Sequence, residues 1–220
     1  MSNTGAKRGP YARSRQRRED VANAVLELID ELGHEGVTTT LVAERSGISE
    51  ATVLYHFPTK DHLLVAALQR ADELTAAESG VANVFSGTVD PDPDGLEHFE
   101  DMLAASRGID TSPRARLLYM LRGQAATPGH PAAEYFEQRD AEAIGIFAKL
   151  IGARQEIGLV HPKVDPRDAA TQFIAMWNGL GAMAYLHVDF DVNRLVLAGL
   201  RLLLGEQLMA ARARLDELEP

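Results

Sequence analysis

The sequence has no cysteine among its 220 residues. Disulfide cross-links, thiol catalysis and cysteine-ligated zinc are therefore excluded, and we expect a chain that works in the reducing cytoplasm. No apolar stretch follows the basic N-terminus, so we expect no secretory signal. Ala169–Val188 carries no formal charge and is about long enough to cross a bilayer, but its Gln172 and Asn178 favour a helix buried in protein. We therefore expect no membrane partner.

Catalytic and metal-binding motifs are also scarce. There is no Gly-x-Ser-x-Gly, phosphate-binding glycine loop or His-Glu-x-x-His, so we expect neither an enzyme nor a cofactor. The acidic loop Asp90–Gly95, followed by Asp101, approaches the spacing of an EF-hand calcium site. Asp101 stands where a bidentate glutamate is needed and two prolines stiffen the loop. Asp94 with Glu97 is better interpreted as a capping box, and cation binding stays an open alternative.

Positive charge is concentrated at one end of an acidic chain. The formal net charge is −10, yet residues 1–60 hold eight basic and eight acidic residues, so the whole excess lies in residues 61–220. The first eighteen residues contain six basic residues and no acidic one: Lys7, Arg8, Arg13, Arg15, Arg17 and Arg18. An acidic body with a basic end is compatible with a protein that binds DNA at that end only.

Nearly every long segment has helical periodicity, and no run of alternating β-branched residues indicates a strand. We predict an all-α fold. The first helix should cover Ser14–Leu32 and stop at Gly33, and Thr59 should cap a helix over residues 60–77. Short helices are predicted at residues 39–46 and 49–56. After a connection over Ser79–Asp94, further helices are predicted at Gly95–Ser106, Pro113–Ala125, Pro131–Ile157, Pro166–His187 and Val192–Leu218.

Residues 39–58 have the pattern of a helix-turn-helix. Small Ala43 lets two helices approach, Gly47 permits the turn, and Ser49 can cap the second helix. Ile48 and Val53 would fill the core. An ordinary helical hairpin is the alternative, but the basic N-terminus and the segment Thr52–Lys60 favour a DNA-binding motif. The residues expected at the DNA are Ser49, Glu50, Ala51, Thr52, Leu54, Tyr55 and His56, together with Arg13, Arg15, Arg17 and Arg18.

The segment from about residue 17 to 68, above all Ala43–Ser49 and Tyr55–Leu64, resembles the DNA-binding domain of tetracycline-repressor (TetR) family regulators. The resemblance implies that Thr38 and Thr39 approach phosphates, that Thr52 and its neighbours meet bases or backbone, and that His56 and Lys60 touch phosphate. Many members have tyrosine two residues after the threonine, where this chain has Leu54. Which of Leu54 and Tyr55 faces DNA is therefore open.

The same resemblance implies a homodimeric repressor that leaves a palindromic operator in double-stranded DNA when a small apolar or aromatic effector binds. We divide the chain into a basic arm (1–18) leading into the first helix, a helix-turn-helix domain (14–60) and a helical effector-binding and dimerisation domain (61–220). The resemblance also implies that the last two long helices of each subunit form a dimer bundle. Small and apolar residues support close packing there: Gly179, Gly181, Ala182, Ala184, Leu195, Leu200, Leu203 and Leu204. The alternative is that these residues form an intramolecular core.

The sole tryptophan, Trp177, lies in a segment rich in large apolar residues and is a candidate for lining an effector cavity. The other apolar candidates are Phe99, Met102, Leu103, Leu117, Met120, Leu121, Phe136, Phe173 and Met176. Arg122, Arg139 and Asn178 are the polar candidates that would orient the effector. Each is also a residue type that builds ordinary cores, so a DNA-binding dimer without small-molecule control remains the alternative function.

Overall fold

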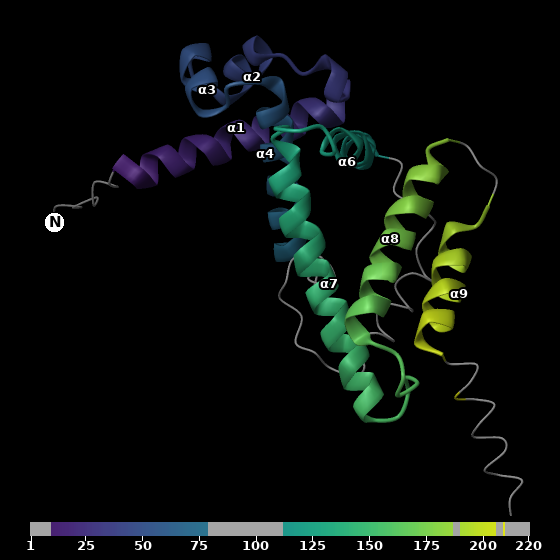
Figure 1. Cartoon of the computed structure of the whole chain (residues 1–220). Helices are drawn as coiled ribbons and strands as arrows, with labels where there is room; N and C mark the ends of the chain where they lie inside the picture. The colour runs from purple at the N-terminus through teal and green to yellow at the C-terminus, as the bar shows by residue number, and fades with distance from the viewer. Residues whose placement is uncertain (1–9, 79–111, 187–189, 206–208, 210–220) are drawn as a thin grey trace, which may run out of the picture. The chain divides into compact units, whose positions relative to one another are not determined.

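The computed structural model describes residues 10–78, 112–186, 190–205 and 209, and the regular elements of this part are all helical (Figure 1). The all-α fold class is confirmed. The segments predicted as the helix Gly95–Ser106 and the acidic loop Asp90–Gly95 lie outside the described residues. The elements are α1 (Pro10–Leu32), the 3₁₀ helix η1 (His34–Gly36), α2 (Thr39–Ser46), α3 (Glu50–His56), α4 (Lys60–Glu78), α6 (Pro113–Gln124), α7 (Ala132–Glu156), α8 (Pro166–Ala184) and α9 (Val192–Leu204).

Several helix boundaries follow the capping residues that the sequence indicates. Gly33, with φ 71°, comes directly after α1, where a left-handed backbone suits glycine. The Asp165 carboxylate accepts from the N–H groups of Arg167 and Asp168 at 2.9 Å, which satisfies the exposed donors at the start of α8. The hydroxyl of Thr59 likewise accepts from the N–H of His62 at the start of α4. These predicted starts and stops are confirmed.

Two boundaries differ from the prediction for identifiable reasons. The first helix begins at Pro10 rather than Ser14, because proline is well tolerated in a first helical turn, where its missing N–H has no helical partner. The helix predicted over Val192–Leu218 is interrupted after Leu204. Gly205 adopts φ 70° there, and its N–H bonds back to the carbonyls of the last turn of α9.

The chain divides into two compact units. The first contains the described residues up to 73 together with 112–135, so α6 and the first turn of α7 belong with the N-terminal helices. The second contains the end of α4 and the described residues from 136 onward. Packing therefore divides the chain after residue 73 and after residue 135, and not at residue 60. Both α4 and α7 begin in the first unit and end in the second.

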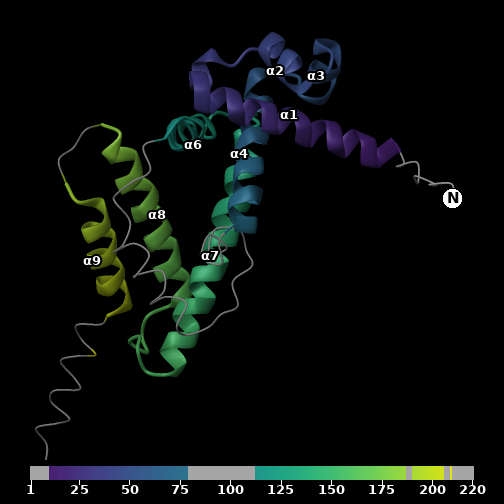
Figure 2. The ribbon, with the colours of Figure 1, turned by 180° about the vertical axis from the view of Figure 1, so that it is seen from behind.

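In the first unit α1 packs against α2, η1 and α6 (Figure 2). Val21, Val25 and Ile29 of α1 are fully buried and are spaced four residues apart, which puts them on one face of the helix. Val53 on the inner side of α3 and Phe57, which follows the helix as its C-cap, are both buried. Each such side chain contributes about 1.5–3 kcal/mol relative to exposure, so this small unit has a core able to hold α3 in place.

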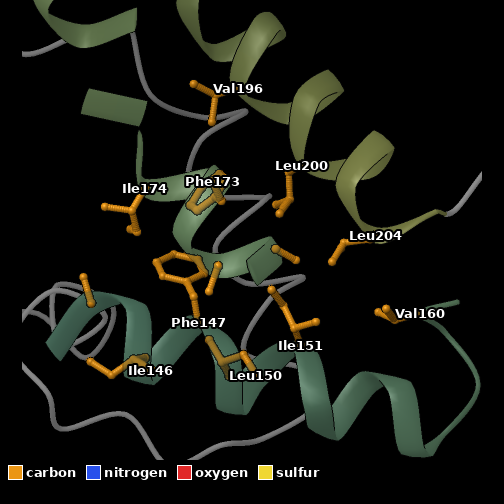
Figure 3. Close-up of a cluster of buried hydrophobic side chains, with 13 residues drawn as sticks. Ile146, Phe147, Leu150, Ile151, Val160, Phe173, Ile174, Val196, Leu200 and Leu204 are labelled. Carbon is orange, nitrogen blue, oxygen red and sulfur yellow. The ribbon is translucent and has the colours of Figure 1, made fainter. Parts of the chain in front are cut away.

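The second unit is built around one apolar cluster from three helices, whose side chains point toward one another in Figure 3. Phe147 of α7 and Phe173 of α8 are both fully buried, with ring centroids 4.7 Å apart. Val196, Leu200 and Leu204 of α9 complete the cluster. Leu200 and Leu204 therefore belong to the intramolecular core, which was the alternative to a role between subunits, because they are buried within a single chain.

The close approach of α8 and α9 depends on a glycine that the sequence pattern did not single out. A Cβ atom at Gly199 of α9 would lie 2.2 Å from the sulfur of Met176 on α8. Gly179, expected to allow close packing, has open space around it instead. No helix in the described part of the chain is long and apolar enough to cross a membrane.

Candidate nucleic-acid interface

The basic residues near the N-terminus lie on a helix. Arg15, Arg17 and Arg18 lie on α1, within the expected first helix, and because α1 begins at Pro10 rather than Ser14, Arg13 is helical as well. All four are exposed. Arg15 pairs with Glu19 one turn later, at 3.4 Å. A rigid helix fixes the direction of each cation, so the four arginines need not act alike.

Arg18 supports the end of α3. Its guanidinium donates to the main-chain carbonyl of His56 at 3.5 Å and its central carbon lies 4.8 Å from the centroid of the Phe57 ring. A cation suits this position, because the carbonyl end of a helix carries partial negative charge and the ring face is electron-rich. Arg18 therefore helps to hold α3 against α1.

The turn between α2 and α3 has the geometry expected of a helix-turn-helix. The Thr38 hydroxyl caps α2 by accepting from the N–H of Leu41 at 3.2 Å. Gly47 adopts φ 67° and donates to the last carbonyls of α2. Ser49 caps α3 by accepting from the N–H of Thr52, and the two hydroxyls lie 2.8 Å apart. The predicted turn and cap are confirmed, although Ile48 is only half-buried whereas Val53 is fully buried.

The outer side of α3 presents side chains that are exposed in the part of the chain that the structure describes. Tyr55 is 82% exposed and Leu54 is 43% exposed, while Glu50 and Ala51 are also exposed. Both Leu54 and Tyr55 therefore face solvent. They lie on different edges of the helix: Leu54 is one turn from Glu50, and Tyr55 is one turn from Ala51.

An open concavity of about 400 Å³ lies between α1 and α3. Its lining residues are Ser14 and Arg17 from α1 and Ala51, Thr52, Tyr55 and His56 from α3. The wall thus combines a guanidinium, hydroxyls and an imidazole, which are groups that bind phosphate oxygens. Sequence reasoning missed Ser14, although the spacing of residues 14, 17 and 18 puts them on one face of a helix.

His56 has a pKa below the ordinary value for histidine, first because it is partly buried and then because Arg18 and Arg17 are close. Burial and neighbouring cations both disfavour the protonated imidazole. His56 is therefore mostly neutral at pH 7 in the free protein. A phosphate placed in the concavity would act in the opposite direction and favour protonation.

Two residues predicted to touch phosphate have partners within the chain. The Lys60 ammonium donates to the carbonyl of Glu35 in η1 at 2.9 Å, which accounts for a cation at the start of a helix without invoking a bound anion. The Thr39 hydroxyl donates to Glu50 Oε1 at 2.7 Å. A phosphate contact by either residue stays a prediction, and Lys60 has further N–H donors for it.

The candidate effector residues differ in where they lie and in how far they are buried. Phe99, Met102 and Leu103 lie outside the described residues. In the first unit Leu117 and Leu121 are fully buried, and Met120 and Arg122 are half-buried. In the second unit Phe136 and Phe173 are buried in the core. The residues left partly accessible in the second unit are Arg139, Met176, Trp177 and Asn178.

Fold and interface together define a helical protein with an N-terminal helix-turn-helix, and comparison with known proteins shows which family this motif matches. Residues 23–67 match the sequence model of the bacterial regulatory proteins of the tetR family. This match confirms the resemblance of residues 17–68 to the DNA-binding domain of TetR-family regulators. The match covers the end of α1, all of α2 and α3, and the first part of α4.

Individual relatives give the extent of the similarity. The chain is 38% identical over 74 residues to the transcriptional repressor KstR of Mycolicibacterium smegmatis, a segment covering 34% of this chain and 36% of that protein. It is 26% identical over 202 residues to the transcriptional regulator TcmR of Streptomyces glaucescens, covering 86% and 84%. The fold is shared with a TetR transcription regulator from Haloarcula marismortui at a TM-score of 0.67 and 20% identity, over 87% and 97% of the two chains. The chain thus spans only about a third of the length of the KstR that it matches.

Proposed function

We propose that the chain is a sequence-specific DNA-binding transcriptional regulator that reads the major groove with α3. The observation that carries this proposal is the outer side of α3, where a helix held firmly by Val53 and Phe57 presents Leu54 and the 82%-exposed Tyr55 to solvent. A short helix with a buried inner side and an exposed outer side is what groove reading requires. The relatives named as transcriptional repressors and regulators support the same function.

In this proposal the concavity between α1 and α3 receives a phosphate of the DNA backbone. Arg17 supplies a permanent charge there, Ser14 and Thr52 supply hydroxyls, and His56 supplies a donor whose charge depends on pH. These groups fix the register of α3 on the duplex without reading bases. Bases would be read by the neighbouring exposed side chains of α3.

We further propose that the DNA-binding form is a homodimer that reads a palindrome, because one seven-residue helix covers too few base pairs. Two α3 helices would then lie about 34–36 Å apart. Support comes from an exposed stripe on α8, formed by Ala175, Gly179, Ala182 and Met183, and from exposed Leu186 just after the helix. On α9, Ala198 and the 64%-exposed Leu202 offer matching apolar surface. Apolar surface of this kind is typical of subunit interfaces.

The specific form of the proposal is a repressor released by a small apolar or aromatic effector. Half-buried Trp177 supports an effector site, because its ring centroid lies 6.3 Å from that of the buried Phe173 and its remaining surface is accessible. Both α4 and α7 run from the unit that contains α3 into the unit that contains Trp177, so two covalent paths connect them. A DNA-binding dimer without small-molecule control is the second candidate.

The proposed function is tested by selecting DNA from a random pool with the purified full-length protein. We expect an enriched palindrome and binding that weakens as salt rises, because phosphate contacts release counterions. Tyr55→Ala should weaken binding without unfolding the protein, since Tyr55 is 82% exposed. Leu32→Ala is the matched control, because Leu32 is 52% exposed on α1 of the same unit, away from the concavity.

The absence of any enriched sequence, or equal losses in Tyr55→Ala and Leu32→Ala, would overturn the proposal. Effector control is tested separately by a thermal-shift screen of apolar and aromatic compounds, because a compound that binds the folded state stabilises it. Every hit is then measured for its effect on operator affinity. Hits that leave operator affinity unchanged would favour the dimer without small-molecule control.

A further inference from the structure

The first residue of α3, Glu50, is an exposed carboxylate on the surface that we propose to face DNA. Phosphate repels a carboxylate, so an acidic side chain at this position lowers affinity for any DNA sequence. A residue that lowers general affinity can still be useful if it discriminates between sequences, because specificity is a difference of affinities. The contacts of Glu50 within the chain are therefore informative.

Glu50 is held in one position by the preceding helix. Its Oε1 accepts from the Thr39 hydroxyl at 2.7 Å, and the Thr40 hydroxyl lies 3.4 Å from the same atom. Both threonines belong to the first turn of α2, which packs directly against α3 (Figure 1). The carboxylate is thus positioned by both helices of the motif, and ordering it before DNA arrives lowers the entropic cost of a contact.

The two oxygens of Glu50 have different surroundings. Oε1 takes both threonine contacts, and within the part of the chain that the structure describes no hydrogen bond involves Oε2. An ionised carboxylate only accepts hydrogen bonds. Oε2 therefore lies in a fixed position on the exposed side of α3, where it can accept a hydrogen bond from a donor on another molecule.

We propose that Glu50 is a specificity-determining residue that accepts a hydrogen bond from the N4 amino group of a cytosine in each half-site, with Thr39 as its positioning residue. This inference rests on the proposed function. In the major groove guanine and thymine present oxygen acceptors that a carboxylate avoids, and the amino group of adenine lies beside its N7 acceptor. Cytosine presents a donor without an adjacent acceptor, so it suits Oε2 best.

A purely structural role for Glu50 would involve the same contacts with Thr39 and Thr40, but it would affect stability and not base preference. Glutamate in the first turn stabilises a helix through the helix dipole, and the bond from Thr39 would then only join α2 to α3. In that case replacing Glu50 would lower stability and leave base preference unchanged. Base preference is therefore the measurement that separates the two roles.

The test is selection from a random DNA pool with the full-length protein and four variants, followed by affinities for operators carrying each base at the selected position. The wild type should prefer cytosine over the other bases by at least about 5-fold, the lower end of the range for a good bidentate base contact, because Oε2 accepts a single hydrogen bond. Glu50→Ala should reduce this preference to less than about 3-fold and raise affinity for unrelated DNA, because the repulsion is removed. Glu50→Gln should accept adenine as well, since an amide can both donate and accept.

The positioning role is tested by Thr39→Val, which removes the hydroxyl with little change in size, and by Thr39→Ser, which keeps it. Thr39→Val should weaken the cytosine preference, measured as the ratio of affinities for operators with different bases, and Thr39→Ser should retain it. Retention of the wild-type preference by Glu50→Ala would overturn the inference. Failure of the wild type to select any DNA would instead overturn the proposed function, so the two failures are distinguishable.

Discussion

The guanidinium carbon of Arg18 lies 4.8 Å from the centroid of the Phe57 ring, across the interface between α1 and the end of α3. Phe57 is fully buried, so the pair joins a core residue to a residue of the basic cluster. The arginines of α1 therefore have separate tasks. Arg18 positions α3, Arg17 lines the concavity, and Arg13 is left exposed for longer-range attraction.

Replacing Arg18 with alanine should lower the free energy of unfolding by about 0.5–1 kcal/mol, the usual contribution of a cation over an aromatic ring at an exposed site. Arg13→Ala is the matched control and should leave stability within about 0.5 kcal/mol of wild type. Urea denaturation measures both values. Both variants should bind DNA more weakly at low salt. Equal stability of the two variants would contradict a structural role for Arg18.

Protonation of His56 should link DNA binding to pH. The pKa of His56 in the folded free protein is lowered, so as pH falls the unfolded chain takes up a proton at this residue before the folded protein does. The contribution of His56 to the free energy of unfolding is therefore lost as pH falls below about 6.5. A bound phosphate favours the protonated form, so operator affinity should rise as pH falls from 8 to 6. If phosphate raises the pKa by one unit, each His56 contributes at most about tenfold, and the full gain is reached only well below the pKa of the free protein.

Affinities of wild type and His56→Gln, measured across this pH range at constant ionic strength, test the linkage. The variant removes the titrating group, so the difference between the two pH profiles isolates His56 from the other histidines. Parallel profiles would mean that no phosphate lies close to His56 in the complex.

Gly179→Leu should dissociate the proposed dimer without unfolding the subunit. Nothing in the described part of the chain lies within 4 Å of a Cβ at Gly179, so the larger side chain has room in one subunit but not beside a second. Gly123→Leu on α6, also exposed and with open space around it, is the control. Sedimentation velocity at micromolar concentration distinguishes monomer from dimer. A Gly179→Leu protein as dimeric as the control would contradict an interface on α8.

Two aromatic residues of the second unit should respond differently to truncation. Phe147 is fully buried against Phe173, so Phe147→Ala should lower the free energy of unfolding by about 3–5 kcal/mol. Trp177 is half-buried, so Trp177→Phe should cost less than about 1.5 kcal/mol. If Trp177 lines an effector site, the same variant should also bind the hits of the thermal-shift screen more weakly. A loss above 3 kcal/mol for Trp177→Phe would assign it to the core.

The sequence predicted the helices and the motif well because their signals are local. Gly33, Gly47 and Ser49 act through the backbone of their own turn, so their identity is enough to place a helix end or a cap. The spacing of Val21, Val25 and Ile29 likewise fixes which face of α1 is buried. These features depend mainly on residues that are close in the sequence, so composition and periodicity are enough to predict them.

Only the tertiary structure decided what each exposed or basic residue is used for. Arg18 and Lys60 look alike in the sequence as cations of a DNA-binding segment, yet one lies over Phe57 and the other donates to Glu35. The contact of Thr39 with Glu50 joins residues of two helices, and the burial of Leu200 depends on α7 and α8. Such roles depend on which side chains meet after the helices pack, and helical periodicity gives a residue's face but not its partner.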